Sequence, residues 1–219
     1  ISESSYQFIK KKINIKNQNI FWPSKVIKLF YEDKKNIKNF LNFEEKDKNL
    51  MYIFKNKEFK KILNKQIKKK KNIKVIKKNI KNIDHKKGGI MLKKNYFMYD
   101  LIILSIGGHS MLYNKITNGR SIQKNYKEIA LTATVKHKDK ITNVSQFFLN
   151  EGPLAILPFN KKMFSVVWSI SNVFFQKNYK IIKKILGEKL KIVLNNPKIE
   201  NIQNIQKFPI NLNLKTKYF

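Results

Sequence analysis

Four short β-rich segments follow one another in the second half of the chain, and they constrain the fold more than any other feature. Each segment is rich in β-branched and aromatic residues, and turn-forming residues separate them at Asp139, Gly152-Pro153 and Asn160. The segments cover residues 129–137, 144–149, 154–159 and 163–169. Consecutive strands joined by such short turns predict an antiparallel sheet.

Amphipathic patterns on both sides of this sheet predict helices. In residues 179–194, apolar side chains recur at helical spacing, as they do in residues 56–70. Polar capping residues precede an apolar face in residues 2–9, which is typical of a helix start. We therefore expect three helices in these ranges.

Shorter alternating segments predict further strands. Residues 25–32 and 39–43 would form a hairpin around the charged turn at 33–36, and the turn at Gly88-Gly89 would reverse a second hairpin into residues 90–92. Strands are also expected at residues 73–76 and 208–214.

The apolar run from Tyr99 to Ile106 ends abruptly at Gly107-Gly108. A continuous β-branched run closed by two glycines predicts a buried parallel strand that enters a tight turn. Ligands gather at the carboxyl ends of such strands, and glycine lets a ligand come close to the backbone. A strand-to-helix turn without a ligand is the alternative interpretation.

The formal net charge of +33 is consistent with binding to nucleic acid or to an anionic membrane surface. However, Arg120 is the single arginine, and the chain is crowded with Lys, Asn and Ile, which share A/T-rich codons. Recognition of phosphates and bases usually recruits arginine for its bidentate fork. We therefore favour biased base composition, and we expect no specific nucleic-acid partner. A basic binding protein for nucleic acid or an anionic membrane stays the alternative.

Several classes of site are excluded by composition and spacing. The chain has no cysteine, and its histidines, His85, His109 and His137, are too far apart for a typical metal-ligand spacing. No catalytic triad or carboxylate pair stands out either, so no catalytic residue is assigned. No apolar run approaches the roughly 18 residues that a membrane span requires.

Several segments, taken in order, resemble the ubiquinone-biosynthesis hydroxylases, which are FAD-dependent aromatic monooxygenases of the para-hydroxybenzoate-hydroxylase type. The best match is Gln146, Phe148 and residues 152–158, followed by residues 167–169. The other matching segments are residues 50–56, 100–110, 133–137 and 208–210.

This resemblance implies an α/β (α+β) fold that is truncated at both ends. It would combine part of a Rossmann-like FAD-binding domain with an antiparallel-sheet substrate domain. Residues 1–20 and 51–118 would belong to the FAD-binding domain, and residues 21–50 and 119–206 to the substrate-binding domain. Residues 207–219 would form a return strand toward the FAD domain.

The resemblance also implies an activity. NAD(P)H would reduce FAD, and O₂ would then form a flavin hydroperoxide that hydroxylates the ring of a polyprenylated phenol in ubiquinone biosynthesis. The implied cofactor-binding residues are Gly107, Gly108 and Ser110. The implied substrate-pocket residues are Gln146, Phe148, Gly152, Pro153, Leu157, Pro158 and Trp168. We expect a cytoplasmic protein with peripheral contacts to the inner membrane surface or to other enzymes of the pathway.

The chain departs from the family pattern at several positions. Ile106 stands where the family has an aspartate, and Tyr113 and Phe147 stand where it often has arginines. The Gly-x-Gly-x-x-Gly loop and the later Gly-Asp motif are both missing from these 219 residues. We therefore expect this segment alone to bind FAD poorly, and a decayed, non-catalytic relative is a further alternative.

Overall fold

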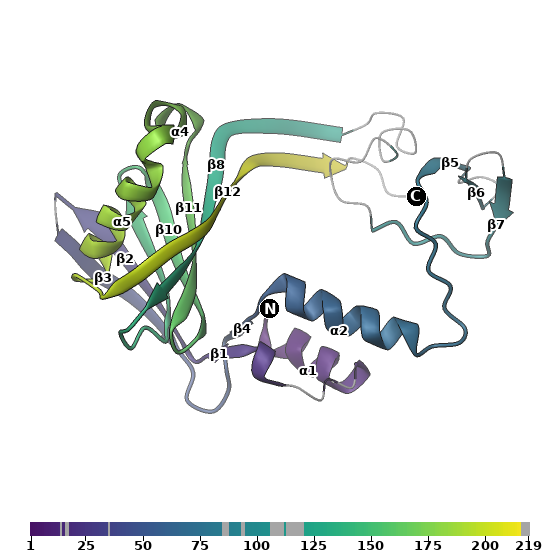
Figure 1. Ribbon diagram of the computed structural model, residues 1–219, viewed down its shortest axis with the longest axis horizontal. Helices are drawn as coiled ribbons and strands as arrows, with labels where there is room; N and C mark the ends of the chain where they lie inside the picture. The colour runs from purple at the N-terminus through teal and green to yellow at the C-terminus, as the bar shows by residue number, and fades with distance from the viewer. Residues whose placement is uncertain are drawn as a thin grey trace. The chain divides into compact units, whose positions relative to one another are not determined.

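The structure is a computed structural model of the chain (Figure 1). It describes residues 1–13, 15, 18–34, 36–84, 88–92, 95–105, 112 and 121–215. Contacts divide the chain into two compact units. The larger comprises Ile1–Lys70 and Lys127–Ile210, and the smaller comprises Lys71–Tyr126 and Asn211–Phe219.

A seven-stranded sheet forms the centre of the larger unit. Its strands are β2 (Val26–Asp33), β3 (Asn36–Glu44), β8 (Ser121–His137), β9 (Val144–Leu149), β10 (Gly152–Asn160), β11 (Met163–Ser171) and β12 (Ile199–Lys215). They lie in the order β12-β8-β11-β10-β9-β2-β3. Neighbours from β8 to β9 are antiparallel, which confirms the predicted four-stranded sheet, and β2 joins it parallel to β9.

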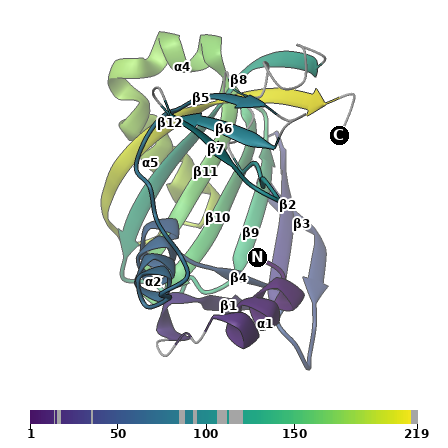
Figure 2. The same cartoon turned by 90° about the vertical axis from the view of Figure 1, so that its right-hand side faces the viewer.

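Two helices, α4 (Asn172–Asn178) and α5 (Ile182–Val193), cover one face of this sheet, with the short helix η2 (Tyr179–Ile181) between them. Figure 2 looks onto the sheet from the side away from α5. Side chains from alternate positions of the strands meet the helices in one core, because successive residues of a strand point to opposite faces. Its fully buried members include Leu131, Leu154, Ile156, Phe164, Val166, Trp168, Leu186 and Leu190.

Ion pairs between half-buried side chains hold α5 to the end of the sheet at which the β9–β10 turn lies. The Nζ atom of Lys189 lies 2.7 Å from Oε1 of Glu151 and 3.7 Å from Oε1 of Glu32. The backbone N–H of Asn150 donates to the other oxygen of Glu32 at 2.8 Å. These contacts tie the helix to β2 and to the β9–β10 turn.

A second, smaller core lies where α1 (Glu3–Lys12), the short helix η1 (Gln18–Ile20), β1 (Trp22–Ser24), β4 (Met51–Ile53) and α2 (Asn56–Lys68) meet. Ser2 caps α1 by accepting a hydrogen bond from the N–H of Ser5, as expected for a helix start. The ring of Tyr6 stacks on that of Tyr52 with their centroids 3.8 Å apart. Phe59 of α2 reaches the same cluster through Phe21.

The smaller unit contains an antiparallel sheet of β5 (Ile80–Asp84), β6 (Gly89–Leu92) and β7 (Asn95–Met98). The hairpin predicted around Gly88-Gly89 is confirmed. The strand predicted at residues 73–76 is wrong, because residues 73–79 have no regular secondary structure.

The buried parallel strand predicted from Tyr99 is also wrong over its described part, residues 99–105. Leu101 is 76% exposed and Ile103 is 80% exposed, and no strand forms there. A buried parallel strand needs parallel neighbours, whereas the described sheet of this unit is antiparallel. The N–H of Tyr99 donates to the carbonyl of Gly88 at 2.9 Å, and this hydrogen bond extends the pairing of β6 and β7 by one residue.

Candidate functional site

The face of the large sheet opposite α4 and α5 carries the candidate site. On β10, Pro153, Ala155 and Leu157 point to this open face, because they alternate with the core residues Leu154 and Ile156. Each strand therefore offers one set of side chains to the helices and another set to a ligand.

A cavity of about 640 Å³ lies between this open face and the first turn of α2. That volume falls within the usual range for small-molecule and cofactor sites. The strands contribute Thr134, Leu157, Phe159, Met163, Ser165, Gln203 and Asn204, and the β4–α2 segment contributes Ile53, Phe54, Lys55, Asn56, Lys57, Glu58 and Lys61. The cavity combines an apolar floor with hydroxyl and amide groups that can donate and accept hydrogen bonds.

Lysines dominate the charge around this cavity. The Nζ atom of Lys55 lies 4.5 Å from the centroid of the Phe159 ring and 3.9 Å from Oε1 of Glu58. Glu58 is the one carboxylate among the described lining residues, whereas Lys55, Lys57 and Lys61 are all cationic. The cavity therefore has a positive rim above an aromatic and aliphatic floor.

A second, purely apolar hollow of about 400 Å³ lies on the same face of the sheet, and we call it the aromatic cleft. Tyr31, Phe40 and Phe148 line it. The centroid of the Phe40 ring is 5.9 Å from that of Tyr31 and 6.0 Å from that of Phe148. An irregularity in the β2–β3 register leaves Phe40 without a paired residue and so turns it toward the other two rings.

The pairing register shows that the cavity and the aromatic cleft share one face. Tyr31 pairs with Phe148 across β2 and β9, and Phe148 pairs with Pro153 across β9 and β10. Leu157, at the cavity, lies four residues further along β10 on the same side. The two hollows therefore lie on one continuous open face.

The substrate-pocket residues predicted from the sequence divide between the two faces. Leu157 lines the cavity and Phe148 lines the aromatic cleft, while Gln146 and Pro153 also point to the open face. Trp168 and Pro158 point to the helix side, where Trp168 is fully buried and its Nε1 donates to the carbonyl of Gly152 at 3.3 Å. These two side chains fill the core and do not line either hollow.

Gly152 itself has a structural role in this arrangement. Its φ is +127°, and a Cβ added to it would lie 2.1 Å from the carbonyl oxygen of Ser169.

The predicted cofactor-binding residues Gly107, Gly108 and Ser110 lie outside the described residues.

Other residues of the two hollows were not predicted from the sequence, namely Lys55, Phe159, Thr134, Tyr31 and Phe40. They come from segments far apart in the chain, and the cavity exists because the start of α2 lies beside the open face of the sheet. For Lys55 the local sequence held one usable signal, since it directly precedes the predicted helix.

His137 does not belong to this site. It continues the core side of β8 and is fully buried, with its ring 5.1 Å from that of Phe164. Neither ring nitrogen has a hydrogen-bond partner within the described part of the chain. Burial lowers the pKa of His137, so the neutral imidazole is favoured in the folded protein. The described residues also contain no cluster of His, Asp or Glu suited to a metal ion.

No protein-family model and no curated protein matches the chain. Solved structures do. The chain is similar to CmlS, a flavin-dependent halogenase, with a TM-score of 0.66 and 13% identity over 92% of this chain and 39% of that one. It is similar to the flavin-dependent brominase Bmp2, with a TM-score of 0.69 and 12% identity over 97% of this chain and 57% of that one.

A third similar structure is a geranylgeranyl bacteriochlorophyll reductase-like protein from Thermoplasma acidophilum. Its TM-score is 0.60, with 15% identity over 93% of this chain and 54% of that one. The chain therefore spans between about two fifths and three fifths of these structures. Its fold is mixed α/β and corresponds to part of the fold of flavoprotein monooxygenases and halogenases. The predicted fold class is therefore confirmed.

The assignment of the chain to ubiquinone biosynthesis stays a prediction.

Within the described part of the chain, no helix is both long and apolar enough to cross a bilayer.

Proposed function

We propose that the chain is part of an FAD-dependent aromatic hydroxylase that acts on a polyprenylated phenol. One observation carries the proposal: a ligand-sized cavity and an aromatic cleft share the open face of the sheet, in a fold otherwise found in flavin-dependent enzymes. Bound FAD, reduced by NAD(P)H, would supply the chemistry that activates O₂, and the protein would position the ring and exclude water.

The residues around the cavity fit a planar ring system. Leu157, Phe159 and Met163 offer an apolar surface, and Thr134 and Asn56 offer hydrogen-bonding groups at its margin. A flavin or phenol ring has the same combination of apolar faces and a polar edge. The described residues supply no glycine-rich loop for the phosphates of FAD. The cavity therefore suits the flavin ring of FAD or the ring of the substrate, and not the phosphates of FAD.

The aromatic cleft suits an apolar chain attached to that ring. The step from Leu157 to Pro153 covers about 13 Å along the strand, at roughly 3.3 Å per residue. Phe148 and Tyr31 continue the same face across the next two strands. A prenyl chain that lies on this track would bury apolar surface at a gain of about 25 cal/mol per Å².

The proposal includes the domain assignment made from the sequence. Residues 21–50 and 119–206 would bind the substrate, residues 1–20 and 51–118 would help bind FAD, and residues 207–219 would return toward the FAD domain. A lipid-tailed substrate would also account for a cytoplasmic enzyme that works at the inner membrane surface, in contact with other enzymes of the ubiquinone pathway.

The test uses the full-length protein and a series of phenols with side chains of increasing prenyl length. Hydroxylated product is measured by mass spectrometry, and NAD(P)H consumption by absorbance. We expect Phe40→Ala to raise KM for the long-chain phenols about tenfold, since a lost aromatic contact is worth roughly 1.4 kcal/mol. KM for a phenol without a chain should stay unchanged.

Phe8→Ala is the matched control, because Phe8 lies on α1 and is 63% exposed. It should leave KM unchanged for every phenol. Equal effects of Phe40→Ala on long and short phenols would remove the tail subsite. A flavin-loaded protein that hydroxylates no phenol would overturn the proposed function.

A further inference from the structure

We infer that the free edge of β3 pairs with the β3 strand of a second copy of the chain, so that the protein forms a two-fold symmetric dimer. β3 is the last strand of the seven-stranded sheet, and it pairs with β2. Among the described residues, no strand pairs with the other edge of β3 (Figure 1). The inference concerns the assembly of the protein and does not depend on the proposed function.

The exposed side chains of β3 are largely apolar. Phe40 is 52% exposed, Leu41 is 42% exposed and Phe43 is 49% exposed. A strand at the edge of a sheet also presents unpaired N–H and C=O groups, which can pair with a further strand. β3 therefore offers both backbone hydrogen bonds and apolar contacts to a second copy.

The strand at the opposite edge of the sheet, β12, is protected against such pairing. It contains Pro209, which has no N–H to donate, and Lys207, whose charge opposes the approach of another strand. Asn204 of β12 has a φ of +54°, which departs from extended strand geometry. β3 has no proline, and its single lysine, Lys38, forms an ion pair with Asp33. Of the two edges, β3 is the one open to pairing.

The bulge in β3 restricts how two copies can pair. Phe40 has no paired residue on β2, and its ring meets that of Tyr31 on the open face. Leu41 pairs with Leu29, which lies two residues from Tyr31 and therefore on the same face. Two consecutive residues of β3 thus point to the open face. At an ordinary sheet edge, such a bulge disturbs pairing with another strand.

An antiparallel pair with its two-fold axis between Phe40 and Leu41 removes this obstacle, because the two bulges then oppose each other. Phe40 of each copy lies opposite Leu41 of the other copy, on the open face. Asn39 and Asn42, whose Nδ2 and Oδ1 atoms are 2.9 Å apart, share the face covered by the helices and lie opposite each other in this register. A shift by one residue would put side chains of opposite faces against each other.

The register also brings compatible side chains together. Two Phe40–Leu41 pairs form one apolar cluster across the axis, and cross-strand pairs of this kind stabilise a sheet. Lys38 lies opposite Phe43 of the other copy, where an ammonium group can interact with the face of the ring. Phe40 also lines the aromatic cleft, so the second copy would cover part of an apolar surface that is exposed in one copy.

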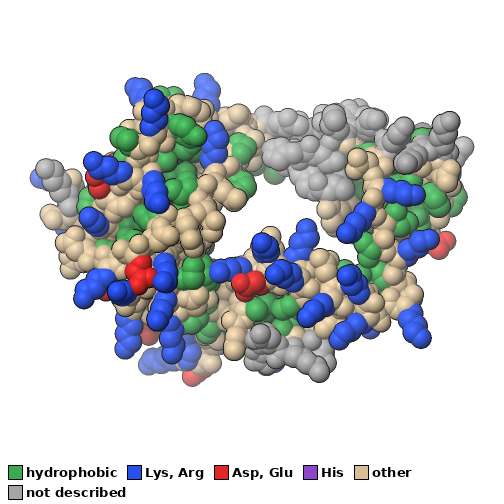
Figure 3. All heavy atoms as spheres, viewed as in Figure 1, with side chains coloured by type: hydrophobic (Ala, Val, Ile, Leu, Met, Phe, Trp, Pro, Cys, Tyr) green, Lys and Arg blue, Asp and Glu red, His purple; other side chains and the backbone are tan. Residues whose placement is uncertain are grey.

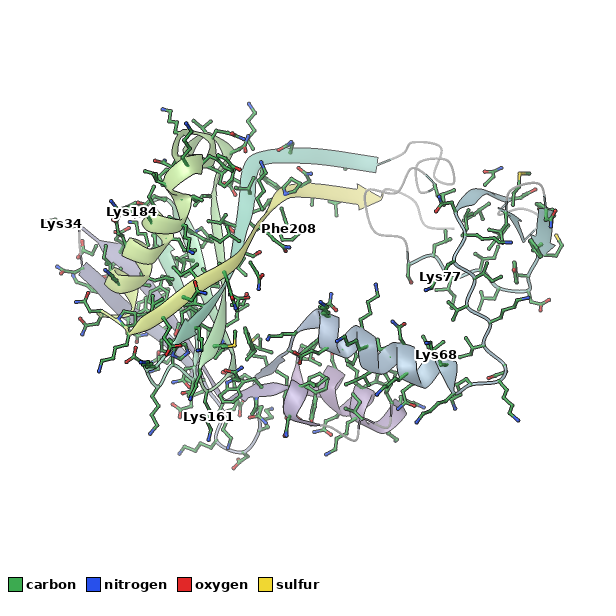
Figure 4. All side chains as sticks on the ribbon, in the orientation of Figure 1. Lys34, Lys68, Lys77, Lys161, Lys184 and Phe208 are labelled. Carbon is green, nitrogen blue, oxygen red and sulfur yellow. The ribbon has the colours of Figure 1, made fainter. Side chains whose placement is uncertain are left out.

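Charge favours β3 as the contact between copies. The chain has a formal net charge of +33, and Figure 3 shows lysine side chains over much of the visible surface. Two copies therefore repel each other where lysines meet. β3 carries one lysine, Lys38, and one glutamate, Glu44, so the strand has no net charge. Lys34 lies at the tip of the β2–β3 hairpin and not on the strand (Figure 4).

Sedimentation equilibrium of the full-length protein at several salt concentrations measures the dimer. One strand from each copy makes a small contact beside a standard interface of about 1,600 Å², so we expect a reversible dimer. Its affinity should rise with salt, because salt screens the repulsion between two chains of high positive charge. A protein that stays monomeric at every salt and protein concentration would overturn the inference.

Leu41→Lys tests the centre of the contact. It removes both apolar pairs and places two charges beside the axis, so it should weaken the dimer at least about tenfold. Ile192→Lys is the matched control, because Ile192 lies on α5 and is 52% exposed. The control adds the same charge away from β3 and should leave the dissociation constant nearly unchanged. Circular dichroism checks that both variants fold, and equal weakening by both variants would overturn the inference.

Cysteine cross-linking tests the register, because these 219 residues contain no cysteine. Asn39→Cys and Asn42→Cys proteins are prepared separately, one of them with an affinity tag, and are mixed under oxidising conditions. Positions 39 and 42 of two copies lie opposite each other, whereas position 42 of one copy lies about 10 Å along the strand from position 42 of the other, too far for a disulfide. The mixed disulfide should therefore form faster than either homodisulfide. Equal rates, or the absence of the mixed disulfide, would show that the copies do not pair in this way.

Discussion

Replacing Gly152 by alanine should destabilise the larger unit strongly. The φ of Gly152 is +127°, a region that residues with a Cβ rarely adopt, and occupying it costs about 1–3 kcal/mol. The added Cβ would also lie 2.1 Å from the carbonyl oxygen of Ser169, so β10 or β11 must move by nearly 1 Å. Such a shift should weaken at least one hydrogen bond of the sheet, at about 1 kcal/mol. We therefore expect a loss of roughly 2–4 kcal/mol.

The assay is urea denaturation followed by circular dichroism, with Gly187→Ala as the matched control. Gly187 lies inside α5, and a Cβ there would meet Cδ1 of Ile202 at 3.6 Å, an ordinary contact. Alanine is favoured over glycine in a helix by about 0.5–1 kcal/mol, so this variant should be more stable than the wild type. The same substitution thus has opposite expected signs at two sites. A Gly152→Ala protein as stable as the wild type would refute the reasoning.

Two further predictions concern the half-buried ion pairs of Lys189 and the buried imidazole of His137. Lys189→Met should lower the free energy of unfolding by about 2–3 kcal/mol, because it leaves the carboxylates of Glu32 and Glu151 without their shared cation. In the same urea assay, adding Glu32→Gln and Glu151→Gln to this variant should restore most of the lost stability. Burial lowers the pKa of His137, so the unfolded chain binds this proton more tightly and stability is full above about pH 6.5. Below that pH, the free energy of unfolding should fall by up to about 1.4 kcal/mol per pH unit. The measurement is the difference between the urea midpoints at pH 7.5 and pH 5.5, and His137→Phe should remove the contribution of the imidazole to that difference. If the difference is unchanged in the variant, His137 does not carry the effect.

The part of the fold that was predictable from the sequence depends on local patterns. The segments rich in β-branched and aromatic residues, and the short turns between them, predict an antiparallel sheet without knowledge of distant residues. The parallel pairing of β2 with β9 joins segments more than a hundred residues apart, and no local signal encodes it. The apolar run after Tyr99 misled the prediction because hydrophobicity alone does not supply a neighbouring strand.

The candidate site shows the same limit. Leu157 and Phe148 were assigned to the pocket by resemblance, and they lie at the cavity and at the aromatic cleft. Trp168 was assigned to the pocket by resemblance, yet its position in β11 turns it toward the helices. Lys55 and Phe159 meet because the start of α2 lies beside the open face of the sheet. In a chain with 47 basic residues, the sequence does not distinguish Lys55 from the other lysines.

The most direct test of the account is the visible absorption spectrum of the purified full-length protein. The account predicts flavin bands near those of free FAD, and release of about one FAD per chain on denaturation, as analysed by chromatography. A colourless protein that releases no flavin, and that takes up none when refolded with excess FAD, would contradict the proposal that this fold serves flavin chemistry in this chain.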